Sequence, residues 1–249
     1  MNIINVCILG LIQGLTEFLP VSSSGHLAIV QRLIPGFSQP GVLFDAVLHF
    51  GTVLAVIFYF RKKIFDILKK DRKYLILLMT GTVPVIFVGL AFRVQIEEIF
   101  NNLKFVGIAL VITGILNFLT DQAKEIKKEI SVKNSFLIGI AQAIAIIPGI
   151  SRSGSTIFAS TSLGIKKEKA AEFSFLLSIP AVLGANLLEF IHYKNFAFVN
   201  LWFYVSGFIF AFISGIIAIN LALKLLKNKG FKIFSYYCLI VGLVVFILL

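Results

Sequence analysis

Near its N-terminus this 249-residue chain carries a carboxylate inside an apolar segment. The residue is Glu17, in the run QGLTEFLPVSSSGH that extends from Gln13 to His26. An ionised group at membrane depth is energetically costly, and such groups usually face a cavity, a partner or an ion. Gln13 precedes Glu17 by four residues, so the two side chains share one face of a helix. The pair could take part in catalysis, bind an ion together or form a hydrogen bond.

Histidine is the second reactive residue type in this run. His26 is of the residue type that can titrate near neutrality, which suits a general base or a nucleophile. It follows three serines and a glycine at a predicted helix start, and we expect it to be functional. His49 lies in an otherwise apolar segment, and we interpret it as a packing or hydrogen-bonding residue. His192 is predicted to lie in an exposed loop and needs no functional role.

A second polar run, PGISRSGST from Pro148 to Thr156, contains Arg152 as its cation. A guanidinium group is permanently charged and matches phosphate oxygens with two parallel hydrogen bonds. Glycines allow the backbone to approach closely, and hydroxyls and the free amides of a following helix N-terminus add donors. This combination predicts a phosphate-binding loop. An internal ion pair between Arg152 and Glu17 is the alternative, and one arginine could do both, holding Glu17 when the site is empty and phosphate when it is filled.

The two polar runs are related to each other. Gln13–His26 aligns with Gln142–Ser155 at a constant offset of 129 residues. Identities inside the runs are Gln13 with Gln142, Ser22 with Ser151, Ser24 with Ser153 and Gly25 with Gly154, and those in the flanks are Gly10 with Gly139, Phe44 with Phe173, Leu48 with Leu177, Val53 with Val182 and Leu54 with Leu183. We therefore expect one integral membrane domain over residues 1–249, made of two related halves at approximately 1–120 and 130–249.

The elements that position these motifs are predicted to be membrane helices. The chain is 58% hydrophobic and 14% charged, with a mean hydropathy of +0.97, which excludes an ordinary soluble domain. Six segments approach the roughly 20 apolar residues that a bilayer requires: Val42–Phe60, Tyr74–Phe92, Phe105–Thr120, Ala170–Phe190, Leu201–Leu223 and Ile233–Leu249.

The two motif segments follow a different pattern. Ile3–Leu19 stops at Pro20, Phe136–Ile147 stops at Pro148, and a short apolar run follows each proline. A helix, a break and a second helix, each of about half the spanning length, are typical of a re-entrant hairpin. The predicted fold is therefore an all-α polytopic membrane protein with six transmembrane helices and two re-entrant hairpins.

The distribution of charge predicts the orientation of the chain. Its net charge is +11, and most of the 23 Lys and Arg residues lie in short loops within 61–73, 124–133, 166–169 and 224–232. This pattern argues against nucleic acid as a partner. By the positive-inside rule these loops are cytoplasmic and both termini are outside. The two hairpins then enter from opposite faces, which makes the halves inverted-topology repeats. Anionic lipids are the expected partners of the basic loops.

Together, the two motifs are similar to those of the undecaprenyl pyrophosphate phosphatase family, the bacitracin-resistance integral membrane proteins of bacteria. The resemblance covers the whole chain and includes FDAVLHFGT (Phe44–Thr52) and EFSFLLSIP (Glu172–Pro180). It implies a multi-pass protein of the bacterial cell membrane that hydrolyses undecaprenyl pyrophosphate to the monophosphate carrier used in cell-wall synthesis. It also implies hairpins within inverted repeats, as expected above, and it suggests a homodimer.

The resemblance also implies roles for individual residues. Glu17 would be the catalytic or metal-binding carboxylate, and Ser23 and His26 would act as nucleophile or in proton transfer. Arg152 would disperse charge on the transferring phosphoryl group. The residues expected to bind the substrate phosphates are Ser22, Ser24, Ser151, Arg152, Ser153 and Thr156.

A metal cofactor is expected as well. Family members often have a second glutamate where this chain has Gln13. One carboxylate from Glu17, the carbonyl oxygen of Gln13 and substrate phosphates still suit Mg²⁺ or Ca²⁺, since these cations take oxygen ligands. The alternative function is a polyprenyl-phosphate flippase or an ion-coupled transporter, because inverted repeats with broken helices are a transporter architecture.

Overall fold

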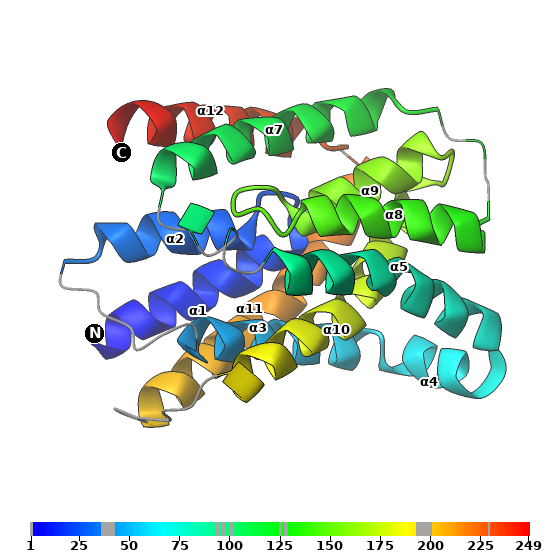
Figure 1. Cartoon of the computed structure of the whole chain (residues 1–249), viewed down its shortest axis with the longest axis horizontal. Helices are drawn as coiled ribbons and strands as arrows, with labels where there is room; N and C mark the ends of the chain where they lie inside the picture. Colours follow the sequence, from blue (N-terminus) through cyan, green and yellow to red (C-terminus); the bar gives the residue numbers. More distant parts are fainter. Residues whose placement is uncertain are drawn as a thin grey trace.

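The computed structural model of the chain describes residues 2–35, 43–92, 95, 98–99, 102–124, 126, 129–192, 201–228 and 230–249, and these residues form helices and connections without strands. In chain order the helices are α1 (Ile3–Phe18), α2 (Ser23–Leu33), α3 (Leu43–Tyr59), α4 (Arg61–Lys70), α5 (Arg72–Ala91), α7 (Leu103–Gln122), α8 (Val132–Ile144), α9 (Arg152–Ser162), α10 (Lys167–His192), α11 (Leu201–Asn228) and α12 (Lys232–Leu248). Figure 1 shows their arrangement.

Several helices are suited to cross a membrane. Among the described residues, α5, α7, α10 and α11 are long and apolar enough to span a bilayer, and α3 with α4 adds a fifth span if this pair, bent by 74°, is counted as one. Helix α12 is apolar but has 17 residues. The prediction of an all-helical, multi-pass membrane protein is confirmed, with four or five spans by length and composition.

Two pairs of shorter helices form the centre of the molecule. Helix α1 runs inward from one end and α2 returns toward that end, while α8 and α9 do the same from the opposite end (Figure 1). The chain turns near the middle in both cases. A serine caps each returning helix, because Ser22 Oγ accepts from Gly25 N at 3.3 Å and Ser151 Oγ accepts from Gly154 N at 3.1 Å. Matching residues of the two motifs therefore end both turns in the same way.

Glycines let these inner helices approach their neighbours closely. Helix α1 packs on α11 and α8 packs on α5. A Cβ atom on Gly10 would lie 2.6 Å from the carbonyl oxygen of Gly207, and one on Gly139 would lie 2.4 Å from that of Gly81. Neither separation is tolerable for a side-chain carbon. Small residues at such crossings are how membrane helices gain close packing.

Helix α7 fixes the two turns relative to each other. Asn117 Nδ2 donates to the carbonyl oxygen of Pro20 at 2.6 Å, in the first turn. Thr113 Oγ1 donates to the Gly149 carbonyl at 2.8 Å and accepts from Ser151 N at 2.9 Å, in the second. Irregular backbone at membrane depth needs such partners. These contacts explain how two proline-containing turns are accommodated inside an apolar molecule.

Candidate active site

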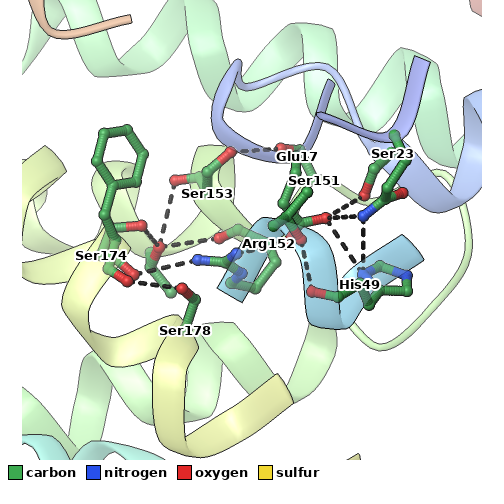
Figure 2. A network of polar contacts seen from close by, with 12 residues as sticks. Glu17, Ser23, His49, Ser151, Arg152, Ser153, Ser174 and Ser178 are labelled. Atoms are coloured by element: carbon green, nitrogen blue, oxygen red, sulfur yellow. Dashed lines mark hydrogen bonds and ion pairs between the residues drawn. The ribbon is translucent and has the colours of Figure 1, made fainter. Parts of the chain in front are cut away.

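Glu17 and Arg152 form an ion pair between the two turns. Arg152 Nη2 donates to Glu17 Oε1 at 2.6 Å, and the side chains are 15% and 6% exposed. Glu17 is next to last in α1, whereas Arg152 is the first residue of α9. Figure 2 shows the pair at the centre of a polar network. The internal ion pair considered from the sequence is therefore present.

Helix α10 holds the other side of the guanidinium group. Arg152 Nη1 donates to the carbonyl oxygen of Ser174 at 3.1 Å. The Ser174 hydroxyl lies 2.7 Å from Thr156 Oγ1, and Thr156 is fully buried in α9. Both ends of the guanidinium fork are thus occupied, one by a carboxylate and one by a backbone carbonyl. Nothing in the sequence pointed to Ser174 beyond its place in the EFSFLLSIP run.

The second oxygen of Glu17 contacts a hydroxyl and an amide. Ser23 Oγ donates to Glu17 Oε2 at 2.6 Å, and Gln13 Nε2 donates to the same oxygen at 3.0 Å. The expected pairing of Gln13 with Glu17 on one helix face is confirmed. A hydroxyl within hydrogen-bond reach of a base, which is itself oriented by a third group, is the arrangement of an activated nucleophile. Here Glu17 is in the position of the base, and Arg152 orients it.

His49 of α3 is the residue that sequence reasoning undervalued. Its Nδ1 atom lies 2.9 Å from Gln13 Nε2 and 3.5 Å from Glu17 Oε2. The His49 side chain is 27% exposed, more than those of its partners. The position of His49, 32 residues after Glu17 in the sequence, gave no indication of this contact, because the packing of α3 on α1 creates it. Hydrogen bonding was the expected role, but not with these partners.

The remaining hydroxyls gather where the two turns meet. Ser22 Oγ lies 3.3 Å from Ser24 Oγ, and Ser151 Oγ lies 3.2 Å from Ser153 Oγ, which also donates to the carbonyl of Leu19 at 3.2 Å. Helices α2 and α9 begin at these serines, so two helix N-termini, which favour anions, lie beside the ion pair. The arrangement suits a phosphate group.

Ser22 has a strained backbone. Its φ of 70° is the only positive value outside glycine among the described residues. Such a conformation costs about 1–3 kcal/mol and persists where the surroundings enforce it, often at functional sites. Ser22 Oγ caps α2 and its carbonyl accepts from His26 Nδ1 at 2.8 Å. The strained turn therefore places both the cap and the histidine.

Among the described residues, the hydrogen-bond partners of His26 are Ser22 and Tyr237 rather than Glu17. Since Nδ1 must donate to the Ser22 carbonyl, Nε2 of a neutral ring can accept from the Tyr237 hydroxyl, 2.8 Å away. The two rings also stack, with centroids 5.6 Å apart and planes 8° apart. Tyr237 belongs to α12, so the last helix orients a histidine of the first hairpin. A catalytic role for His26 stays a prediction.

The donor atoms around Glu17, contributed by Glu17, Gln13 and Ser23, suit a hard cation in part. Among the described residues no group of three or more His, Cys, Asp or Glu side chains could hold a metal ion. However, Gln13 is completely buried and its Oε1 atom has no hydrogen-bond partner. An unpaired buried carbonyl is costly, and it is an oxygen of the kind that Mg²⁺ and Ca²⁺ bind. Glu17, Gln13 and Ser23 supply three such oxygens.

The fold and the site together define a multi-pass, all-helical membrane protein with a buried carboxylate, arginine and hydroxyl cluster. Residues 6–244 match the family described as bacitracin resistance protein BacA. The chain belongs to this family.

Relatives match over nearly their whole length. A protein of Methanococcus vannielii is 43% identical over 96% of this chain and 97% of its own length. A protein of Halothermothrix orenii is 42% identical over 100% of this chain and 98% of its own length. A protein of Syntrophotalea carbinolica is 40% identical over 97% of this chain and 97% of its own length. Each of these relatives carries the name undecaprenyl-diphosphatase.

Proposed function

We propose that this protein is an undecaprenyl-diphosphatase of the cell membrane. It hydrolyses undecaprenyl pyrophosphate to undecaprenyl phosphate and inorganic phosphate, which returns the lipid carrier to cell-wall synthesis and confers bacitracin resistance. The observation that carries the proposal is the Glu17 carboxylate, which contacts the Arg152 guanidinium at 2.6 Å through one oxygen and the Ser23 hydroxyl at 2.6 Å through the other.

The roles we assign follow from these contacts. Arg152 exchanges part of its contact with Glu17 and Ser174 for the substrate phosphates and neutralises charge on the transferring group. Further donors around the phosphates come from the hydroxyls of Ser22, Ser24, Ser151 and Ser153. The Thr156 hydroxyl contacts the hydroxyl of Ser174, and the Ser174 carbonyl accepts from Arg152, so Thr156 helps to hold Arg152 in place.

We infer that Glu17 takes the proton of Ser23 as its Oγ bonds to the terminal phosphorus. The bond from this phosphorus to the bridging oxygen breaks, and undecaprenyl phosphate leaves. Water then cleaves the phosphoserine, which releases phosphate and restores the hydroxyl. His26 and Tyr237 form a second proton-handling pair at the same turn.

A divalent cation completes the proposed site. Glu17 Oε2, the unpaired Gln13 Oε1 and Ser23 Oγ are the oxygens that would hold Mg²⁺ or Ca²⁺. When bound, such a cation supplies further neutralisation of phosphate charge.

We assign the lipid tail to an apolar groove between α5 and α8. The groove has a volume of about 610 Å³ and is lined by residues that include Val83, Phe87, Ile140, Ile144 and Ile147. Ile147 immediately precedes Pro148 of the phosphate-binding motif. A polyprenyl chain in this groove would leave its diphosphate at the end of the second turn.

The topology we propose has six spans, two re-entrant hairpins and inverted halves. Helices α3 and α12 have 17 residues each, the lower end of the roughly 17–25 that cross a bilayer. The hairpins enter from opposite ends, and α1 on α11 is matched by α8 on α5. Both chain ends lie at one end of the molecule and α4 lies toward the other (Figure 1), which supports outside termini.

Two partners follow from this topology. Helix α4 combines exposed Phe65 and Leu68 with lysines and an arginine, as expected for a helix on an anionic membrane surface. A homodimer is the oligomer we expect from the family.

Phosphate release by purified protein in detergent tests the function. We expect release from undecaprenyl pyrophosphate that EDTA inhibits and that Glu17→Ala abolishes. A flippase requires a sealed membrane, so folded wild-type protein that releases no phosphate in detergent with Mg²⁺ or Ca²⁺ present would refute the phosphatase and favour the transporter.

A further inference from the structure

The proposed active site is divided between two hairpins. Glu17 and Ser23 belong to the first hairpin, and Arg152 belongs to the second. Arg152 Nη2 joins them by donating to Glu17 Oε1 at 2.6 Å. Ser153 Oγ, also in the second hairpin, donates to the Leu19 carbonyl of the first at 3.2 Å. Both donors are assigned to the substrate phosphates, so these two direct links weaken when phosphate binds, which is when the relative position of the hairpins matters most.

Helix α7 holds both hairpins through side chains to which we assign no contact with phosphate. Asn117 Nδ2 donates to the Pro20 carbonyl in the first turn at 2.6 Å. Four residues earlier, on the same face of the helix, Thr113 Oγ1 donates to the Gly149 carbonyl at 2.8 Å and accepts from Ser151 N at 2.9 Å. Asn117 and Thr113 are fully buried. Because both contacts start from one helix, they hold the two turns at a fixed separation.

The residues that α7 holds are neighbours of the catalytic groups in the chain. Pro20 lies three residues after Glu17 and three residues before Ser23. One hydrogen bond to its carbonyl therefore fixes the backbone between the carboxylate and the hydroxyl. Ser151, whose backbone N–H is held by α7, immediately precedes Arg152. Helix α7 thus holds the backbone beside each half of the proposed site.

The second turn lies directly against α7. A Cβ atom on Gly149, whose φ is 94°, would lie 2.6 Å from the Val106 carbonyl oxygen. One on Gly154 would lie 3.2 Å from Asn117 Oδ1, so Asn117 contacts the start of α9 as well as the first turn. Within the described part of the chain, Asn117 Oδ1 has no hydrogen-bond partner. The amide therefore acts through its donated hydrogen bond and its shape.

We propose that Asn117 and Thr113 are positioning residues, which keep the two hairpins in register while phosphate occupies Arg152. An amide and a hydroxyl do not ionise near neutral pH, so they contribute geometry rather than proton transfer. A reacting group that is misplaced by about 1 Å can lose about 100-fold in rate. The inference rests on the proposed function, because it concerns the alignment of Glu17 and Ser23 with the phosphate that Arg152 binds.

Kinetics of the purified protein in detergent, with undecaprenyl pyrophosphate as substrate, test the Asn117 contact. Asn117→Leu removes the donor at similar volume, and kcat should fall about 10- to 100-fold. KM should change by less than about 3-fold, because Arg152 and the serines that bind phosphate remain. Thr120→Val is the matched control and should keep the wild-type kcat, because Thr120 is equally buried on α7 but donates to the Leu116 carbonyl of its own helix.

Variants of Thr113 test the contact with the second turn. Thr113→Val should lower kcat, whereas Thr113→Ser keeps the hydroxyl and should restore kcat to within about 3-fold of the wild type. Both contacts set one separation between the hairpins. The double variant Asn117→Leu with Thr113→Val should therefore be less than about 2-fold slower than the slower single variant, whereas independent contributions would multiply.

Hydrogen exchange of backbone amides reports on the two hairpins without any substrate. Asn117→Leu should speed exchange in residues 21–25 about 3- to 10-fold, the effect of one lost hydrogen bond. Exchange in residues 150–154 should stay nearly unchanged in this variant. Thr113→Val should have the opposite pattern, with faster exchange in the second turn.

Failure of the positioning role and failure of the phosphatase give different results. Exchange that is unchanged in both single variants overturns the proposal, as does an unchanged kcat in folded Asn117→Leu. Equal losses of kcat in Thr113→Ser and Thr113→Val do the same. Wild-type protein that releases no phosphate refutes the proposed function instead, and the exchange rates then still decide whether α7 holds the two turns. Where Asn117→Leu folds poorly, the two Thr113 variants carry the test.

Discussion

Removing the guanidinium group of Arg152 from its buried ion pair with Glu17 should lower both the stability and the catalytic activity of the protein, for different reasons. In Arg152→Ala the Glu17 side chain, 6% exposed, loses the charged hydrogen-bond donor that Arg152 provides. Breaking a buried ion pair from one side costs about 3–5 kcal/mol, because an uncompensated charge remains. Glu17 keeps hydrogen bonds from Ser23 and Gln13, so we expect the lower end, about 3 kcal/mol.

A double variant separates the two effects. Glu17→Gln with Arg152→Met removes both charges at similar volume, and such replacements are often neutral or stabilising. We expect its free energy of unfolding to return to within about 1 kcal/mol of the wild type. Turnover should nevertheless fall at least about 10³-fold in both variants, or about 4 kcal/mol of transition-state stabilisation.

Thermal unfolding in detergent and phosphate release from undecaprenyl pyrophosphate measure the two quantities. Lys167→Ala is the matched control, because Lys167 pairs with Asp121 at 2.8 Å and is similarly buried; it should lose stability but keep its activity. A double variant that is as unstable as Arg152→Ala would contradict the stability prediction, and folded Arg152→Ala that hydrolyses substrate at the wild-type rate would contradict the catalytic one.

Three further perturbations test other parts of the molecule. Tyr237→Phe keeps the ring stacked on His26 but removes its hydroxyl, so kcat should fall roughly fivefold at unchanged KM, since one hydrogen bond contributes about 1 kcal/mol; an unchanged kcat contradicts this. Gly139→Ala introduces a Cβ 2.4 Å from the Gly81 carbonyl and should destabilise by about 1–3 kcal/mol in thermal unfolding, whereas an unaltered midpoint would exclude the close crossing. Val83→Trp fills the apolar groove and should raise KM for undecaprenyl but not for a short-chain diphosphate; an equal effect on both would remove the groove from tail binding.

The positions of the helices could be predicted from the sequence because they depend on local features, namely apolar segments and prolines. Apolar segments of near-spanning length predicted a membrane protein, and each of the six segments falls on a helix. Helices α3 and α12, with 17 residues each, are shorter than α5, α7, α10 and α11. Pro20 and Pro148 indicated where the inner helices break. Proline acts on its own backbone and its immediate neighbours, so such breaks can be read without knowing the fold.

The active site was predictable only in part. An isolated ionised residue in an apolar segment needs a partner, which marked Glu17 and Arg152, and the four-residue spacing of Gln13 from Glu17 marked the amide as a neighbour on the same helix face. A histidine can be neutral at modest cost, so its presence in an apolar segment is a weaker signal than that of a carboxylate or a guanidinium group. His49 was therefore assigned an ordinary role, while His26 attracted attention through its serine-rich motif.

The sequence alone determined that this protein is a helical membrane protein with two related polar motifs, since composition, proline positions and the charge of single residues act locally. Only the tertiary structure decided that Arg152 reaches Glu17 across 135 residues of chain and that His49, rather than His26, adjoins this pair. These contacts depend on how α3 packs on α1 and on how α7 and α10 pack against α9, which carries Arg152. Packing is the sum of many weak contacts between distant residues, and no short stretch of sequence records it.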